Sequence, residues 1–233
     1  MNSRADARRN VAVLISGRGS NMTALLRACR DDDHPARITM VISNRPGAPG
    51  LEHAAGAGVQ TVTIDHKAYA DGSAFEADVE ATLDAADIDL VCLAGFMKLL
   101  SPGFTERWQG RLLNIHPSLL PSFKGLNVHQ RVIDAGVRIT GCTVHLVTAE
   151  MDAGPILAQA AVAVHPDDTA VSLAERVLTA EHRCYAHALA LYASGQLRFD
   201  GMRIVSSALS GDTIPLDTTM GNLILSPAAA RDR

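Results

Sequence analysis

The chain has 233 residues, 47% hydrophobic and 20% charged, with a formal net charge of −4 at pH 7. This composition is typical of a globular protein with a buried core, and it argues against a nucleic-acid binder that relies on a dense basic surface. The apolar runs fall short of the roughly 20 residues that cross a bilayer. The 4 cysteines are widely spaced and suggest neither disulfides nor zinc. We therefore expect a cytoplasmic protein with no membrane, nucleic-acid or metal partner.

Short apolar runs alternate with helix-like segments through the first two thirds of the chain. The run Val11–Ser16 is followed by Gly17. A continuous apolar run of this kind is typical of a parallel strand buried on both faces. Further strands are expected at 38–43, 61–65, 90–94 and 112–116, and helices at 21–30, 51–57 and 73–86. This βαβ rhythm predicts an α/β fold with a mostly parallel, doubly wound, Rossmann-like sheet.

The pattern changes after Pro121. A helix is expected at 128–135, and alternating strands at 143–147 and 156–164 predict an antiparallel extension. Ser172 and Glu175 have the spacing of a capping box that opens a long C-terminal helix, and Gly195 ends it. The expected organisation is a disordered leader at 1–10, a single domain at 11–198 and a C-terminal tail without periodicity at 199–233.

The strand expected at Leu112–His116 ends on two polar side chains. Strand side chains alternate between faces, so Asn114 and His116 point the same way, and Pro117 ends the ladder because it lacks an N–H group. Open α/β sheets bind ligands at the carboxyl ends of their strands. An amide donor beside an imidazole suits acyl transfer. A lone histidine at a strand end is more often structural.

The segment 114–121 reads Asn-Ile-His-Pro-Ser-Leu-Leu-Pro, which is much more specific than a lone histidine. It resembles the signature of the formyltetrahydrofolate-dependent formyltransferases and hydrolases, and the resemblance covers about 11–198. It implies transfer of a formyl group from 10-formyltetrahydrofolate, as co-substrate, to the amine of 5′-phosphoribosylglycinamide. The products would be formylglycinamide ribonucleotide and tetrahydrofolate, in de novo purine biosynthesis. The implied reaction requires no metal.

The resemblance also assigns the catalytic residues Asn114, His116 and Asp152. Asp152 lies in a turn that is otherwise ordinary, and Ala153 replaces the first glycine of the usual Asp-Gly-Gly-Pro, a mild change unless that position needs a positive φ. His145 is expected to be structural or to support the Asp152 turn. The resemblance further suggests a cis peptide between Leu120 and Pro121.

The segment Ser16–Asn21 joins the first expected strand to the first helix. Its glycines let the backbone approach an anion, and a helix start attracts one. By itself the segment could bind a dinucleotide or merely turn, although the third glycine of a dinucleotide loop is absent. The resemblance assigns the substrate phosphate to Gly19, Ser20 and Asn21. It assigns the amino-ribose to Glu181, for which a solvated helix face is the alternative.

The apolar segment 94–100 follows the fourth expected strand and could be core or could hold a flat heterocycle. The resemblance places the folate pterin against Met97, Lys98, Leu99 and Leu100, with Asn114 also at the folate. Two positions depart from the family pattern. Lys98 replaces an arginine, which loses planar recognition. Gly72 replaces an arginine that helps to bind the phosphate, a loss for which Lys67 or Arg18 could compensate.

Other functions fit the sequence less well. A methionyl-tRNA formyltransferase is expected to carry a further C-terminal domain and a basic surface, and a formyltetrahydrofolate hydrolase an extra N-terminal domain. A non-catalytic nucleotide-binding module would need only the glycine-rich segment, but it leaves Asn114, His116 and Asp152 unexplained. Folate binding would separate that module from an enzyme. The oligomeric state stays open, a homodimer included.

Overall fold

The computed structural model describes residues 8–200, 203–206 and 223–225. The chain divides after Leu113 into two compact units, and each is described by itself. The strand β5, Leu112–His116, starts at the end of the first unit and finishes in the second.

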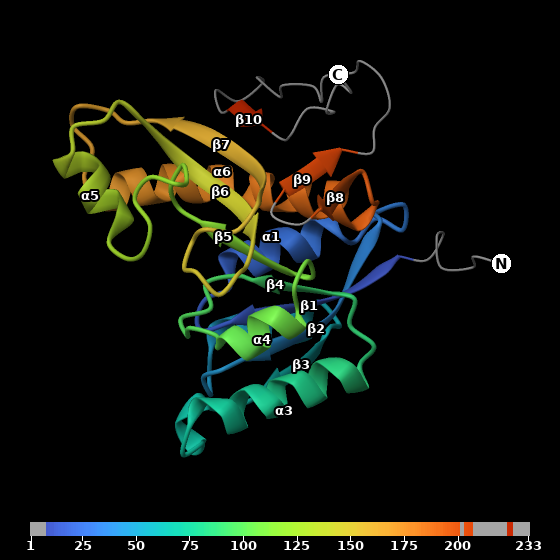
Figure 1. Cartoon of the computed structure of the whole chain (residues 1–233). Coiled ribbons are helices and arrows are strands. Elements are labelled where there is room, and N and C mark those ends of the chain that lie inside the picture. The colour runs from blue at the N-terminus through green and yellow to red at the C-terminus, as the bar shows by residue number, and fades with distance from the viewer. Residues whose placement is uncertain (1–7, 201–202, 207–222, 226–233) are drawn as a thin grey trace. The chain divides into compact units, whose positions relative to one another are not determined.

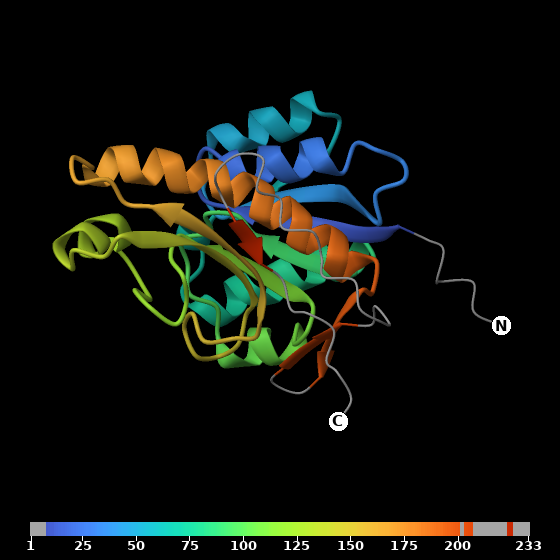
Figure 2. The ribbon, with the colours of Figure 1, turned by 90° about the horizontal axis from the view of Figure 1, so that it is seen from above.

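The first unit is a parallel α/β sheet with the strand order β4-β1-β2-β3. Its strands are β1 (Arg9–Ile15), β2 (Ala36–Ser43), β3 (Gln60–Thr63) and β4 (Leu90–Leu93). Its helices are α1 (Ser20–Ala28), α2 (Pro49–Gly56), α3 (Gly72–Ala85) and α4 (Pro102–Arg107), with a 3-10 turn at His66–Ala68. Figures 1 and 2 show α1 and α2 on one face of this sheet and α3 on the other. Helices on both faces explain why β1 is buried from Val11 onward.

The helix α4 is an element that the sequence analysis missed. It begins with an ordinary start signal, because the Ser101 hydroxyl accepts a hydrogen bond from the Phe104 N–H at 3.2 Å and Pro102 fills the first helical position. The helix has only 6 residues, too few to develop a clear apolar period.

The second unit holds the antiparallel part of the fold, with the strand order β10-β7-β6-β5. Its elements after β5 are α5 (Val128–Asp134), β6 (Ile139–Leu146), β7 (Ile156–Ala163), α6 (Ala170–Ala193), β8 (Leu197–Asp200), β9 (Arg203–Ser206) and β10 (Leu223–Leu225). β7 pairs antiparallel with both β6 and β10. The long helix α6 packs against β6 and β7 (Figure 1). Strands β8 and β9 form an antiparallel pair where no periodicity was expected.

The start of α6 corrects a prediction. The cap is Thr169, not Ser172: the Thr169 hydroxyl accepts from the Ser172 N–H at 3.1 Å, and the Ser172 hydroxyl accepts from the Thr169 N–H at 3.0 Å. Ser172 also donates to Asp168 at 2.9 Å, so its hydroxyl is already committed one turn inside the helix. The capping box is therefore shifted by one turn toward the N-terminus.

The predicted α/β class, the mostly parallel sheet, the antiparallel extension and the long C-terminal helix are confirmed. The single domain at 11–198 stays a prediction. Residues 1–7 of the expected leader and most of the tail lie outside the described residues. The end of the expected leader is wrong, because β1 already begins at Arg9. All four cysteines are buried free thiols. In the part of the chain that the structure describes, no helix is long and apolar enough to cross a membrane.

Candidate active site

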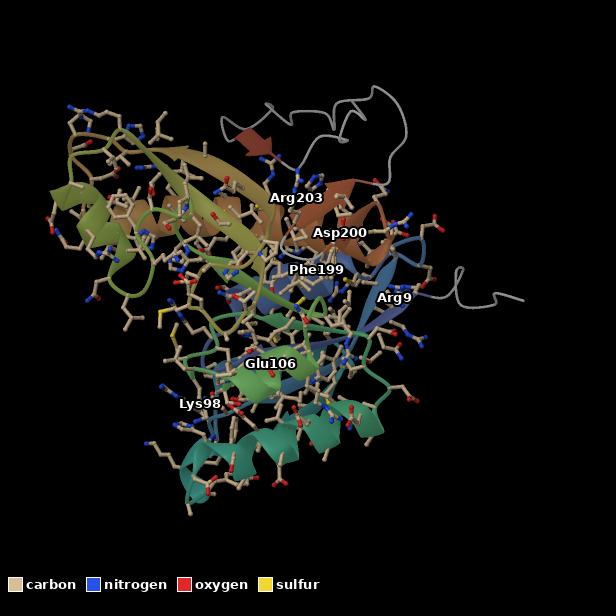
Figure 3. The ribbon with its side chains drawn as sticks, viewed as in Figure 1. Arg9, Lys98, Glu106, Phe199, Asp200 and Arg203 are labelled. Atoms are coloured by element: carbon tan, nitrogen blue, oxygen red, sulfur yellow. The ribbon has the colours of Figure 1, made fainter. Side chains whose placement is uncertain are left out.

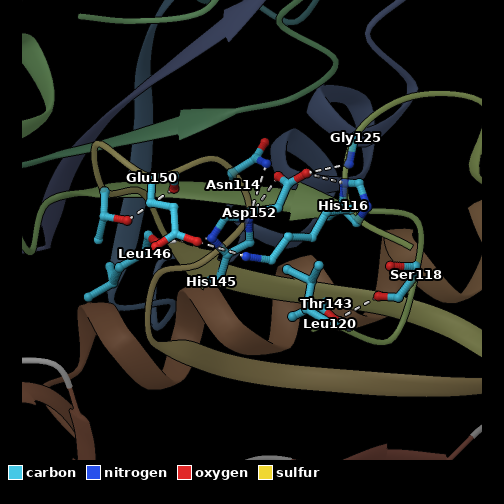
Figure 4. Close-up of polar contacts among 12 residues, drawn as sticks. Asn114, His116, Ser118, Leu120, Gly125, Thr143, His145, Leu146, Glu150 and Asp152 are labelled. Atoms are coloured by element: carbon cyan, nitrogen blue, oxygen red, sulfur yellow. Dashed lines mark hydrogen bonds and ion pairs between the residues drawn. The ribbon is translucent and has the colours of Figure 1, made fainter. Parts of the chain in front are cut away.

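His116 is the last residue of β5 and is 5% exposed. Its Nδ1 lies 3.4 Å from Oδ2 of Asp152 (Figure 4). Its Nε2 lies 3.0 Å from the carbonyl oxygen of Phe123. Both ring nitrogens therefore face oxygen acceptors, so a protonated ring has a partner for each of its N–H groups. Two residues that the resemblance assigns to catalysis, His116 and Asp152, thus lie side by side.

Asp152 is held by the turn between β6 and β7. Its φ is 50°, in the left-handed region that aspartate tolerates better than most residues. Its Oδ2 also accepts a hydrogen bond from the Gly125 N–H at 2.9 Å. Ala153 lies outside the positive-φ region, so its replacement of glycine is mild, as expected. Gly154 is different, because a Cβ there would come 1.8 Å from the Leu146 carbonyl oxygen.

His145 lies close to both Asn114 and Asp152. Its Nδ1 lies 2.9 Å from the carbonyl oxygen of Leu146, which can only accept, so Nδ1 carries the proton. Burial lowers the pKa of His145 and keeps the ring neutral, which leaves Nε2 as an acceptor. The amide nitrogen of Asn114 lies 3.3 Å from this Nε2, and Oδ1 of Asp152 lies 3.9 Å from it. His145 therefore orients the Asn114 amide, a contact that the sequence analysis did not foresee.

The Asn114 amide nitrogen carries two hydrogens, and His145 takes one of them. The second is available to a ligand. Asn114 thus presents a donor that is fixed in direction by a neutral imidazole, next to a histidine that is paired with a carboxylate.

A buried hydroxyl holds the chain that follows His116. The Thr143 hydroxyl donates to the Ser118 carbonyl at 2.7 Å and accepts from the Leu120 N–H at 3.0 Å (Figure 4). Gln159, its partner across β6 and β7, donates to the same hydroxyl and to the Leu120 carbonyl, both at 3.0 Å. The hydroxyl makes one donor and two acceptor bonds, which is its full capacity. The Leu120–Pro121 peptide in this segment is cis, as expected.

In the first unit, the glycine-rich segment enters α1 as expected. Gly19 has a φ of 70° at the helix start, and Ser20 and Asn21 form the first turn. The start of α2 supports the segment, because the Gly50 N–H donates to the Gly17 carbonyl at 3.1 Å. A Cβ on Gly50 would come 2.6 Å from Ile15 Cδ1 and 3.0 Å from the Gly17 carbonyl oxygen, so a side chain there would push these groups apart. The segment presents the N-terminus of a 9-residue helix, which favours an anion.

The segment after β4 exposes large apolar side chains. Met97 is 66% and Leu99 is 73% exposed, so neither is a core residue. The side chain of Lys98 is labelled in Figure 3, and its Nζ lies 5.2 Å from the centroid of the Phe75 ring. The same Nζ lies 3.6 Å from the position of a Cβ on Gly72. Lys98 therefore supplies a cation beside Gly72, where the sequence analysis had considered only Lys67 and Arg18.

Glu181 lies on α6 and is 7% exposed, so the solvated helix face is wrong for it. Its charge contributes to the raised pKa of the Cys142 thiol, after the Cys184 contact and burial. Within the described ranges, no group of three or more potential ligands could hold a metal ion.

Comparison with known proteins identifies the family. Residues 9–189 match the family model described as formyl transferase. The chain belongs to the formyltransferase family. It is 39% identical over 210 residues to phosphoribosylglycinamide formyltransferase of Escherichia coli, an alignment that covers 87% of this chain and 99% of that protein.

A second curated protein and a solved structure are also similar to this chain. The chain is 50% identical over 188 residues, 81% of its length, to the trifunctional purine biosynthetic protein adenosine-3 of Gallus gallus, and the alignment spans 19% of that longer protein. Among solved structures, glycinamide ribonucleotide transformylase 1 of Symbiobacterium toebii superposes with a TM-score of 0.82 at 46% identity, covering 84% of this chain and 93% of that one.

Proposed function

We propose that this protein transfers a formyl group from 10-formyltetrahydrofolate to the amine of 5′-phosphoribosylglycinamide. The observation that carries the proposal is the pairing of His116 with Asp152 at 3.4 Å, in a member of the formyltransferase family. Asn114, oriented by His145 at 3.3 Å, completes the group.

In the proposed reaction the free amine attacks the formyl carbon, and a tetrahedral intermediate with a negatively charged oxygen forms. The second hydrogen of the Asn114 amide donates to that oxygen, and such donors stabilise charge that develops in the transition state. The C–N bond to the folate then breaks. The proton lost by the amine ends on the departing folate nitrogen.

His116 is proposed to act as the protonated ring, which donates toward the intermediate and assists the proton transfer. To do so, its Nε2–H leaves the Phe123 carbonyl that it faces at 3.0 Å. Asp152 stays ionised, orients the ring and stabilises its positive charge. The chemistry requires no metal.

The first unit is proposed to bind the substrates. Gly19, Ser20 and Asn21 offer the helix N-terminus to the ribonucleotide phosphate. Met97, Lys98, Leu99 and Leu100 receive the folate, and the exposure of Met97 and Leu99 supports this assignment. In the second unit, the buried Glu181 is proposed to contact the amino-ribose. The proposed partners are small molecules of the cytoplasm, with neither nucleic acid nor membrane required.

A turnover assay with both substrates tests the proposal. We expect formylglycinamide ribonucleotide and tetrahydrofolate to appear in equal amounts when both substrates are present. Folate alone separates the hydrolase alternative, since water would then accept the formyl group and formate would accumulate. Absence of transfer in a folded protein would contradict the proposed function. Failure to bind folate at all would favour the nucleotide-binding module.

A further inference from the structure

Ser16 is a buried serine for which the proposed reaction has no role. It follows β1 directly and is 5% exposed. Its N–H donates to the carbonyl of Gly95 at 3.2 Å. Its hydroxyl donates to Oδ1 of Asn44 and accepts from the N–H of Met97, both at 2.7 Å. Three hydrogen bonds of one residue thus connect the segments that follow β1, β2 and β4.

The direction of these bonds is fixed by hydrogen counting. A hydroxyl has one hydrogen, and a backbone N–H can only donate, so the bond from Met97 leaves the Ser16 hydrogen for Asn44. Asn44 is 1% exposed, and its amide nitrogen has no partner among the described residues. The bond to Ser16 is therefore the contact that orients the Asn44 side chain, and Asn44 in turn orients the Ser16 hydroxyl.

The segment 95–100 needs such an anchor. The side chains of Met97 and Leu99 are exposed, so they contribute little apolar packing that would fix the backbone. Two hydrogen bonds hold the start of the segment: the Ser16 N–H donates to the Gly95 carbonyl, and the Ser16 hydroxyl accepts from the Met97 N–H. Without the hydroxyl, the partly buried Met97 N–H would lose its acceptor, and such a loss weakens the conformation that the bond holds.

We propose that Ser16 is a positioning residue that holds the segment 95–100 in the conformation that receives folate. The assignment of folate to this segment rests on the proposed function. The hydroxyl acts through the Met97 backbone and does not itself contact the substrate. The same residue starts the glycine-rich segment, but the bonds of its hydroxyl go to Asn44 and Met97 and not to that segment.

The test compares Ser16→Ala with the wild-type protein in two measurements. Amide hydrogen exchange at Met97 reports the hydrogen bond directly, and we expect exchange about tenfold faster in the variant. Binding of 10-formyltetrahydrofolate alone reports the consequence, and we expect its Kd to rise about tenfold, in line with the loss of one partly buried hydrogen bond. The Kd for the glycinamide ribonucleotide should change less than about twofold.

Ser43→Ala is the matched control. Ser43 is also a buried serine at a strand end of the same sheet, but among the residues that the structure describes its hydroxyl bonds only to the backbone of Arg45, at 2.8 and 3.1 Å. This variant should leave Met97 exchange and folate affinity unchanged. Ser16→Thr keeps the hydroxyl and should restore both quantities. If Ser16→Ala does not fold, Ser16→Cys fills the same space with a weak hydrogen-bonding group and carries the same expectation.

The outcomes separate this inference from the proposed function. Unchanged Met97 exchange together with unchanged folate affinity in Ser16→Ala would overturn the positioning role, whatever reaction the enzyme performs. An equal loss in Ser43→Ala would also overturn it, since the effect would then reflect general loosening of the sheet. A wild-type protein that binds no folate would instead refute the proposed function. Faster Met97 exchange in Ser16→Ala would still show that the Ser16 hydroxyl holds the Met97 backbone.

Discussion

Replacing Asp152 by asparagine removes the charge that faces His116 and little else. Asparagine tolerates the left-handed φ of 50° as aspartate does, and its side-chain oxygen can still accept the Gly125 N–H. The side chains of His116 and Asp152 are 7% and 10% exposed, so the lost interaction is only partly screened by water.

The size of the effect follows from the 3.4 Å separation of Nδ1 and Oδ2. Two unit charges at that distance attract by about 5 kcal/mol at an effective dielectric constant of about 20, and by about 1 kcal/mol in bulk water. Since each 1.36 kcal/mol is about tenfold in rate, the loss lies between about fivefold and a few thousandfold. Near-complete burial places the expected loss in single-turnover formyl transfer at about 10²- to 10³-fold.

The control for this variant is Glu150→Gln. Glu150 is on the same turn, its side chain is 77% exposed, and it pairs with Lys124 at 3.2 Å rather than with His116. Removing its charge should change the rate less than about twofold. If Asp152→Asn transfers the formyl group at a rate within about threefold of the wild type, the pairing with His116 does not contribute to catalysis. A similar loss in both variants would point to the overall charge of the turn.

Three further experiments follow from the structure. His116→Ala should slow turnover by about 10²- to 10⁴-fold and leave ribonucleotide affinity nearly intact. Gly19→Val should instead weaken ribonucleotide binding first, because a β-branched residue is strained at a φ of 70°. If each variant changed turnover and ribonucleotide affinity equally, the separate roles of His116 in catalysis and Gly19 in binding would be refuted. Thr143→Val should lower the free energy of unfolding by about 1–3 kcal/mol, since it leaves buried groups unpaired, and Thr143→Ser should not. Burial lowers the pKa of His145 from 6.5, so the unfolded chain binds more protons and stability should fall as the pH drops below about 6.5. In His145→Gln the Tm should depend less on pH over that range.

The parallel strands were predictable because each is buried on both faces and reads as a continuous apolar run. β5 was located to the residue, and β1 began two residues earlier than expected. Short elements were harder. α4 has only 6 residues, and the start of α6 offers two overlapping capping patterns, between which the bonds of Ser172 decide.

The candidate site was predictable in part. The alternation of side chains along a strand placed Asn114 and His116 on one face, and the resemblance supplied Asp152. The contact of His145 with Asn114 depends on which residues face each other on separate strands, which periodicity does not fix. The place of Lys98 depends on the rotamers of a long side chain, so its approach to Gly72 left no trace in the sequence.

The turn at 152–154 also determines where this protein can change by mutation. The left-handed φ of Asp152 restricts its position to few residue types, and the Leu146 carbonyl excludes any side chain at Gly154. Ala153 lies between them and is subject to neither restriction. A saturation library across these three codons should therefore yield functional variants mainly at the middle one. Natural drift should be confined there as well, and the positions on either side should hardly vary.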